Sequence, residues 1–387
     1  MNEKGIPKEE ILQELENRTA KDMTYKSGKI LGSMCSSPHE FAREIYIKYL
    51  EKNLGDPGLF PGTAEIEREL IHELGILFHC PSAYGTLVTG GSEANLIAAR
   101  IAKKSKPNIK KPELIVPVSA HASLDKSSDL LGLKLIKVPL EQDFSLSADR
   151  VAKCVNRKTI GIFGVAGTTS LGLIDPIEEL GSIAEQNNLY FHVDAAFGGF
   201  VIPFLKDLGY NVPKWDFEVP AVKSITADPH KMGLNPIPSG GFLLREQNML
   251  QELGYDIPYL AGGSFKHFQI TGTRPGGVVL AFWGLLKYLG REGFRNIINE
   301  TMNLTNYLVD ELAKIDGIRV VVKPVMNVVG ITPVKPSLSA EKLDEKLRLK
   351  GWALGLFKSY NFLRIVLMPH VKRQHIDAFI KDLQTVL

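Results

Sequence analysis

The chain contains 387 residues, of which 44% are hydrophobic and 23% are charged, with a formal net charge of +3 at pH 7. This length and composition are typical of a globular protein with a large core and two or three packed units. Because the net charge is small and both signs are interleaved, the sequence argues against nucleic acids and anionic membranes as partners.

The first 60 residues differ in pattern from the rest of the chain. The opening stretch MNEKGIPKEEILQELENR is charged and has helical periodicity, so it does not resemble a secretory signal peptide. The Gly- and Pro-rich stretch NLGDPGLFPGT ends this region. We therefore expect a helical segment and an arm over residues 1–60.

Cysteine usage and hydropathy both bear on the compartment. Cys35, Cys80 and Cys154 lie far apart and form no CxxC motif, so disulfides are not expected. No apolar run approaches the ~20 residues of a membrane-spanning helix. These features predict a cytoplasmic protein.

Strand-like and helix-like segments alternate after residue 113. The expected strands are ELIVPVS (113–119), KLIKVPL (134–140), TIGIFGVAG (159–167) and LYFHVDAAFGG (189–199), with helical segments between them. This alternation predicts an α/β fold with a large, mostly parallel sheet that helices cover on both faces. We assign residues 61–285 to this large domain. Ligands in such sheets bind at the carboxyl ends of the strands.

The pattern changes after about residue 286. A long helical stretch reaches roughly residue 316, and short strand-like runs alternate with two further helical segments up to the C-terminus. We expect a smaller α+β domain over residues 286–387.

A carboxylate and a lysine follow two apolar strands. Asp194 ends the strand in YFHVDAAFGG, and Lys231 follows an apolar run in TADPHKMG. A buried carboxylate must be paired, and the small residues after Asp194 leave room for a flat group. A lysine that forms a Schiff base and an acid that pairs with a pyridine nitrogen are what pyridoxal 5'-phosphate requires. The alternative for Lys231 is an ordinary lysine in a surface loop.

The stretch VTGGSEANLIAAR (88–100) supplies a candidate phosphate cup. Its glycines and Ser92 precede a helix, and the backbone N–H groups at a helix N-terminus favour an anion. The stretch is neither a Walker P-loop nor a GxGxxG fingerprint. The alternative is a plain helix cap made by Ser92.

Two histidines also lie near strand ends. His121 follows ELIVPVSA, where its ring could cover a flat ligand, although a polar loop residue is the alternative. His192 and Asp194 share one face of a strand and could be half of a metal site. No third ligand has a convincing spacing, so we expect no metal and interpret His192 as support for Asp194.

Arg364 is the one charged residue in the apolar run NFLRIVLM. Because a guanidinium stays charged, it needs an anionic partner there. That partner is either the carboxylate of a substrate or an Asp or Glu side chain of the protein itself.

Five motifs carry a family resemblance. TGGSEAN, SAHASLDKSSDLLGL, GTTSLGLIDPI, HVDAAFGG and DPHKMG stand in the order seen in group II pyridoxal-phosphate-dependent amino-acid decarboxylases. GKILGSMCSSPHEFA, NLGDPGLFPGT and GTRPGG are similar to the archaeal L-tyrosine/L-aspartate decarboxylase branch in particular. The resemblance covers roughly residues 10–387 and implies pyridoxal-phosphate fold type I, which is aspartate-aminotransferase-like.

The resemblance also implies roles for individual residues. Lys231, Asp194 and His121 would be catalytic: Lys231 bound to the cofactor, Asp194 paired with its pyridine nitrogen, and His121 stacked above its ring. The remaining cofactor contacts would be Ala196 under the ring, Gly91, Ser92 and His230 at the phosphate, and Thr168 near the phenolic oxygen. Thr273 would reach the phosphate from a neighbouring subunit, which makes the protein a homodimer with shared active sites. Arg364 would bind the substrate carboxylate.

Asp228 does not fit the phosphate contacts that the resemblance implies. Asp228 stands where some relatives carry a neutral residue, and a carboxylate cannot help to bind a phosphate directly.

The expected reaction is α-decarboxylation of an L-amino acid, either L-tyrosine to tyramine for methanofuran or L-aspartate to β-alanine for coenzyme A. Lys231 or His121 would return the proton to Cα. The competing interpretations are a carbon–carbon lyase of the sphingosine-phosphate-lyase type and a non-enzymatic pyridoxal-binding regulator.

Overall fold

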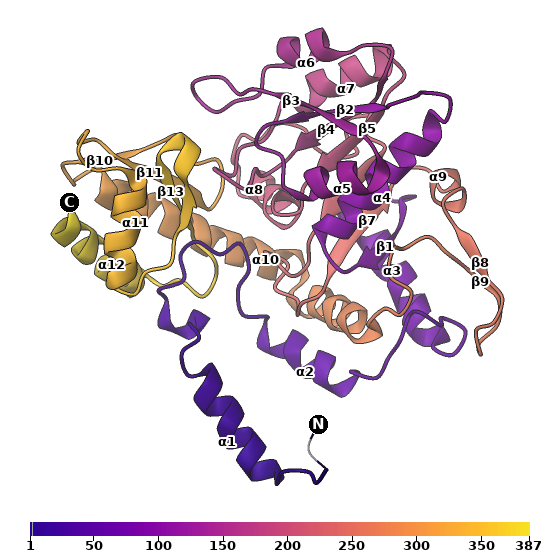
Figure 1. Cartoon of the computed structure of the whole chain (residues 1–387), viewed down its shortest axis with the longest axis horizontal. Coiled ribbons are helices and arrows are strands. Elements are labelled where there is room, and N and C mark those ends of the chain that lie inside the picture. The colour runs from indigo at the N-terminus through magenta and orange to yellow at the C-terminus, as the bar shows by residue number, and fades with distance from the viewer. Residues whose placement is uncertain (2) are drawn as a thin grey trace.

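The computed structural model describes residue 1 and residues 3–387. Two sheets dominate the molecule, and the long helix α10 (Gly276–Leu312) runs between them (Figure 1). The N-terminal helix α1 (Lys8–Thr19) points away from the body, and none of its residues is buried. Three short 3₁₀ helices complete the chain path: η1 (Tyr25–Ser27), η2 (Gly198–Phe200) and η3 (Lys358–Tyr360).

The larger sheet has seven strands in the order β1-β7-β6-β5-β4-β2-β3. They are β1 (Tyr84–Val88), β2 (Glu113–Pro117), β3 (Lys134–Val138), β4 (Thr159–Val165), β5 (Tyr190–Asp194), β6 (Ser224–Ala227) and β7 (Gly240–Leu244). Only β7 runs antiparallel to its neighbours, so the expectation of a mostly parallel sheet is confirmed. The expected strands at 113–119, 134–140, 159–167 and 189–199 correspond to β2, β3, β4 and β5.

Helices cover both faces of this sheet. They are α3 (Pro61–Leu77), α4 (Gly91–Ser105), α5 (Ser123–Leu131), α6 (Ala148–Cys154), α7 (Ile177–Gln186), α8 (Ile202–Asp207) and α9 (Asn248–Gln251). Side chains alternate between two cores: Leu114 and Val116 pack in the cluster that contains α4, and Ile115 packs in the cluster that contains α7. A strand buried on both faces explains the continuous apolar runs in the sequence.

The smaller sheet has four antiparallel strands in the order β10-β11-β13-β12. They are β10 (Ile318–Val320), β11 (Val328–Pro333), β12 (Gly355–Phe357) and β13 (Phe362–Val366), with α11 (Ala340–Leu349) and α12 (Arg373–Val386) packed against them. Outside both sheets lie α2 (Glu40–Lys48) and the hairpin of β8 (Tyr255–Ile257) and β9 (Phe265–His267).

Helix α10 crosses the expected domain boundary. The proposed boundary between residues 285 and 286 falls inside this helix, five residues before a kink at Gly290, whose φ is 58°. A left-handed backbone conformation favours glycine, so the kink is encoded by that residue. The division into 61–285 and 286–387 remains a proposal.

One buried carboxylate makes stability depend on pH. Asp175 is 3% exposed, its carboxylate accepts from the Val165 N–H at 2.8 Å, and burial raises its pKa to about 7. Between pH 4 and 7 the folded chain therefore retains a proton that the unfolded chain releases, so this group lowers stability as the pH rises.

We expect Asp175→Asn to raise the melting temperature by a few degrees at pH 8 and by much less at pH 5. The amide keeps an acceptor for the Val165 N–H but has no charge to desolvate. Thermal scans of both proteins at the two pH values test this, and an equal difference at both would contradict it.

No helix in the described part of the chain is long and apolar enough to cross a membrane.

Candidate active site

A cavity of 290 Å³ lies at the carboxyl ends of β4, β5 and β6. Its lining includes most of the residues singled out from the sequence: Gly91, Ser92, His121, Asp194, Ala196, His230 and Lys231. These residues come from four segments of the chain, and the parallel sheet brings them to one edge.

Asp194 is buried at the end of β5 and is fully engaged. One carboxylate oxygen accepts from the Ala196 N–H at 3.0 Å, and the other accepts from the Asn95 side-chain amide at 2.7 Å. With 5% of its surface exposed, the carboxylate is fixed in orientation toward the cavity that it lines. A negative charge is thereby presented to any ligand in the cavity.

Asn95 is a site residue that the sequence analysis missed. Its carbonyl oxygen accepts from Thr226 Oγ1 at 2.9 Å and lies 3.1 Å from His192 Nε2. Burial lowers the pKa of His192 to about 4, so its ring is neutral at pH 7. These contacts hold the Asn95 carbonyl away from Asp194 and leave the NH₂ group to donate to it. The sequence carried one signal for Asn95, because a residue four positions after Gly91 lies on the same face of the helix.

Both nitrogens of His192 are occupied by protein groups. Nδ1 lies 2.7 Å from Ser224 Oγ and Nε2 faces Asn95. His192 is thus linked to Asp194 through Asn95, and its role as support for Asp194 stays a prediction.

Lys231 lines the same cavity, beside a second buried carboxylate. Its Nζ is 3.3 Å from Asp228 Oδ2, and the Lys231 side chain is 17% exposed. Asp228 is 2% exposed, and its other oxygen has no hydrogen-bond partner within the described residues. Lys231 is therefore not a surface lysine, and its amine is held at the cavity by one ion pair.

The start of α4 forms a cup of small residues. A Cβ on Gly91 would stand 2.9 Å from Asp228 Oδ2 and 3.2 Å from Ala196 Cβ, so only glycine keeps this space open. The helix is capped by Gly90 without a side-chain hydrogen bond, so Ser92 is not the cap considered from the sequence. Backbone N–H groups of this first turn are suited to a phosphate.

Two histidines border the cup with defined tautomers. The Nδ1–H of His230 donates to the Ser239 carbonyl, and its Nε2 faces Asp228 at 3.6 Å. His121 Nδ1 accepts from the Ser123 N–H at 3.1 Å, which places the proton of the neutral ring on Nε2. Desolvation lowers the pKa of both histidines.

Three expected site residues lie outside the cavity lining: Thr168, Thr273 and Arg364. Thr168 is buried, and its hydroxyl oxygen accepts from the Leu173 N–H at 3.0 Å, whereas the next residue, Thr169, lines the cavity. The turn at 167–173 uses Thr168 to close itself, which is why its neighbour faces inward. Thr273 is exposed on the loop before α10 and does not line the cavity of its own chain.

Arg364 lies in β13, between Gly330 and Gly355 on the neighbouring strands. Its two Nη groups donate to the carbonyls of Thr169 and Gly32, and its Nε has no partner within the described residues. Among residues 1 and 3–387, no carboxylate lies within ion-pair distance of Arg364. The alternative expected from the sequence, an ion pair with an Asp or Glu of the chain itself, is therefore wrong for the described residues.

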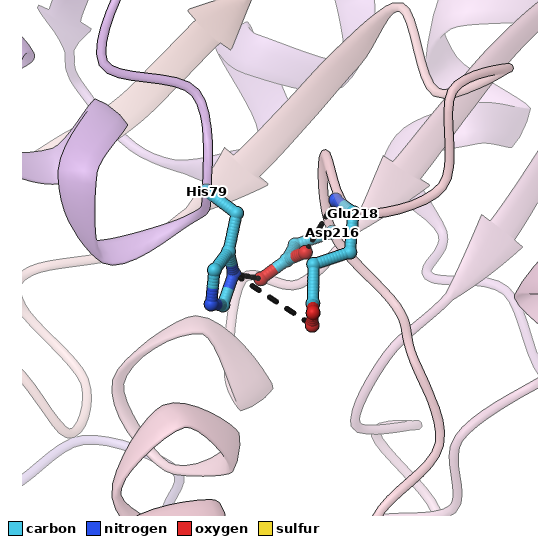
Figure 2. A group of neighbouring side chains, drawn as sticks. All are labelled: His79, Asp216 and Glu218. Atoms are coloured by element: carbon cyan, nitrogen blue, oxygen red, sulfur yellow. Dashed lines mark hydrogen bonds and ion pairs between the residues drawn. The ribbon is translucent and has the colours of Figure 1, made fainter.

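A separate cluster has metal-ligating groups. His79 Nδ1 lies 2.8 Å from Asp216 and 3.8 Å from Glu218 (Figure 2). Lys206 already pairs with Glu218 at 2.9 Å, so the cluster is a charge network that ties the end of α3 to the loop before β6.

Comparison with known proteins agrees with this chemistry. Residues 33–332 match the pyridoxal-dependent decarboxylase conserved domain. The L-aspartate decarboxylase of Thermococcus kodakarensis is 46% identical over 99% of this chain and 98% of its own length.

This chain belongs to the pyridoxal-dependent decarboxylase family. The probable L-tyrosine/L-aspartate decarboxylase of Methanothermobacter thermautotrophicus is 44% identical to this decarboxylase, over 94% of this chain and 99% of its own length. Among solved structures, the Burkholderia pseudomallei sphingosine-1-phosphate lyase is similar with a TM-score of 0.92 and 27% identity, covering all of this chain and 92% of its own. The expected fold type I and the pyridoxal phosphate cofactor are confirmed.

The residues that line the cavity of the decarboxylase fit the chemistry of this cofactor. The cup at Gly91 is kept open by the absence of a Cβ, an amine and an anchored carboxylate face the same space, and His230 borders the cup. Asp228 is the one feature that opposes a phosphate, and its ion pair with Lys231 compensates part of its charge.

Proposed function

We propose that this enzyme removes the α-carboxylate of L-aspartate, L-tyrosine or both, giving β-alanine and tyramine for coenzyme A and methanofuran biosynthesis. The observation that carries the proposal is that Lys231 and the anchored carboxylate of Asp194 line one cavity. The names of the relatives supply the two substrates.

The residues of the cavity would hold the cofactor as follows. Gly91, Ser92 and His230 would bind the phosphate, Ala196 and His121 would flank the ring, and Asp194 would face the pyridine nitrogen. Pyridoxal phosphate, when bound, supplies an electron sink for the pair that a departing carboxylate leaves behind. Asp194 favours a proton on that nitrogen because its negative charge is fixed by Ala196 and Asn95.

Lys231 and the substrate amine would compete for the same position. The Lys231 amine would bind the cofactor covalently and give way to the amine of the substrate, remaining beside Asp228 as a proton carrier. His121 presents its Nε2–H at the cavity and is the other candidate donor of a proton to Cα.

Arg364 is proposed to bind a substrate carboxylate. It is 9% exposed, burial lowers its pKa only to about 10, and it therefore stays a cation at neutral pH. Its hydrogen-bond partners are two neutral carbonyls, one of which belongs to the cavity residue Thr169, and its guanidinium lies over the Phe357 ring. A buried cation without a counter-ion in the described chain, next to the cavity, favours an anionic ligand.

We expect Arg364→Met to raise KM at least about thirtyfold, because losing a buried charge-assisted contact costs about 2 kcal/mol or more. Arg364→Lys should restore affinity only in part, since an ammonium cannot make a two-pronged contact. Steady-state kinetics and the spectrum of the bound cofactor measure both effects.

Arg245 offers a matched control for this experiment. It also donates to backbone carbonyls, those of Val222, Phe217 and Val219, and lies over a Phe ring, but it does not line the cavity. Arg245→Met should lower the melting temperature and leave KM unchanged. If Arg364→Met behaves in the same way, Arg364 has no part in substrate binding.

We also propose that the enzyme is a homodimer with shared sites. An apolar groove of 980 Å³ lies between α2, the start of α3 and α10, with Phe41, Tyr49, Phe60 and Trp283 in its lining. Helix α1 exposes Ile11, Leu12 and Leu15. Apolar surfaces of this extent mark protein interfaces, and a second copy would also bring Thr273 to a cavity that its own chain does not offer it.

A carbon–carbon lyase is the second candidate, because a sphingosine-1-phosphate lyase has a similar structure. Purified enzyme should be incubated with aspartate, tyrosine, glutamate and tryptophan while CO₂ and the amine product are measured. Equal amounts of CO₂ and amine from aspartate or tyrosine support the proposal. Aldehyde formation without CO₂, in a parallel incubation with a phosphorylated amino alcohol, would favour the lyase.

A further inference from the structure

The loop that joins β9 to α10 is anchored near both ends, while its tip is exposed. Gly272 and Thr273 form the tip and are both exposed. A Cβ placed on Gly272 would meet no atom within 4 Å, so no described residue of the same chain covers that side of the tip. An exposed tip on firmly held ends is suited to contact another molecule.

Glu93 provides the first anchor. It is 7% exposed, and its Oε1 accepts from the backbone N–H groups of Ile270 at 3.0 Å and Thr271 at 3.3 Å. Its Oε2 accepts from both the N–H and the hydroxyl of Thr89 at 2.8 Å. One buried carboxylate therefore joins the loop to the residue that precedes the chain's own phosphate cup.

Arg274 provides the second anchor. It is 8% exposed, and its two Nη groups donate to the two oxygens of Glu67 at 2.8 and 3.1 Å. Although burial raises the pKa of Glu67, the adjacent Arg274 lowers it on balance, so the pair is ionic. Arg274 also donates to the Leu87 carbonyl at 2.9 Å, which fixes it to the end of β1.

We propose that Glu93 and the Arg274–Glu67 pair are positioning groups that hold Thr273 for the cofactor phosphate of a second copy of the chain. A carboxylate buried in one subunit then sets the cofactor affinity of the other. This inference rests on the proposed function, because it requires the shared site. Loss of one hydrogen bond to the phosphate should weaken cofactor binding about tenfold.

Mixed dimers test the direction of this effect. Two differently tagged chains are co-expressed, and the mixed species is isolated on both tags. In the first arrangement, one subunit carries Lys231→Ala and the other carries Glu93→Gln. The single intact lysine then faces a loop held by an intact Glu93. In the second, both substitutions lie in one subunit, so the intact lysine faces the weakened loop.

The readout is the dissociation constant of pyridoxal phosphate at the intact lysine, from the absorbance of the cofactor-free dimer during titration. We expect the first arrangement to match a dimer of wild type and Lys231→Ala, and the second to bind about tenfold more weakly. Thr273→Ala in place of Glu93→Gln should give the same pattern. Since Thr273 is exposed, that variant tests the direction even if Glu93→Gln does not fold.

Glu113→Gln is the matched control. Glu113 is also a buried carboxylate, 5% exposed, but its partners are Asn156 and Lys134 at the other side of the sheet. Glu113→Gln in place of Glu93→Gln should leave the cofactor affinity of both arrangements unchanged.

Weak cofactor binding in the first arrangement only would show that Glu93 acts on its own chain through Thr89. Equal affinities, or a chain that is monomeric by light scattering, would overturn the inference. Wild-type protein that binds no cofactor would instead refute the proposed function.

Discussion

Lys231→Ala should abolish turnover. Without the amine, the cofactor would lack its proposed covalent attachment and the cavity would lack the proposed proton carrier, so we expect kcat to fall by at least about 10⁴-fold. The measurement is the rate of amine formation from the best substrate of the panel, with substrate and cofactor at saturating concentrations. Lys223→Ala is a suitable control, because Lys223 precedes β6 and pairs with Glu246 without lining the cavity.

A second variant separates chemistry from stability. Lys231→Ala leaves the buried Asp228 without its ion pair at 3.3 Å, and an unpaired buried charge is destabilising. Lys231→Arg keeps a cation beside Asp228 but removes the primary amine. It should melt near the wild-type temperature and still be inactive. Appreciable activity in the arginine variant would contradict the role given to Lys231.

Asp194→Asn should reduce turnover by several orders of magnitude while the fold persists. An amide cannot hold a proton on a pyridine nitrogen as a carboxylate does, so the electron sink weakens. The oxygen of the new amide can still accept from the Ala196 N–H, but its NH₂ group would oppose the Asn95 amide, which now donates at 2.7 Å.

Two measurements decide the role of Asp194. The kcat of the variant reports the chemical step, and the absorption spectrum of its bound cofactor reports the protonation of the ring. Asp175→Asn serves as the control, since Asp175 is equally buried but does not line the cavity. Near-normal kcat together with a normal spectrum would make Asp194 a structural carboxylate.

The local pattern of the sequence was sufficient for β2 to β6, which run parallel in the large sheet. Strands such as β2 and β4 are apolar along their whole length because both faces are covered, and this makes them visible without a structure. Strand β1 was not among the expected strands, and its partner β7 was missed as well. Strand β7 begins with Gly240 and Gly241, where side chains are excluded by the close approach of Gly90 and Ala227, so its sequence has no strand periodicity.

The candidate site was predictable where a residue follows a strand and carries distinctive chemistry, as Asp194 and Lys231 do. Contacts between distant segments were not. Asn95 supports Asp194 across 99 positions of sequence, and Arg364 reaches Gly32 and Thr169 from a different sheet. Thr168 and Thr169 are chemically alike, and only the closure of the turn onto Leu173 decides which of them faces the cavity.

The most direct test of the whole account is to locate the cofactor on the chain. The purified protein, supplied with pyridoxal phosphate, is reduced with borohydride, digested and examined by peptide mass spectrometry. The account predicts a pyridoxyl phosphate adduct on Lys231, in the peptide that contains TADPHKMG. An adduct on another lysine, or no adduct in protein that has been shown to be folded, would contradict it.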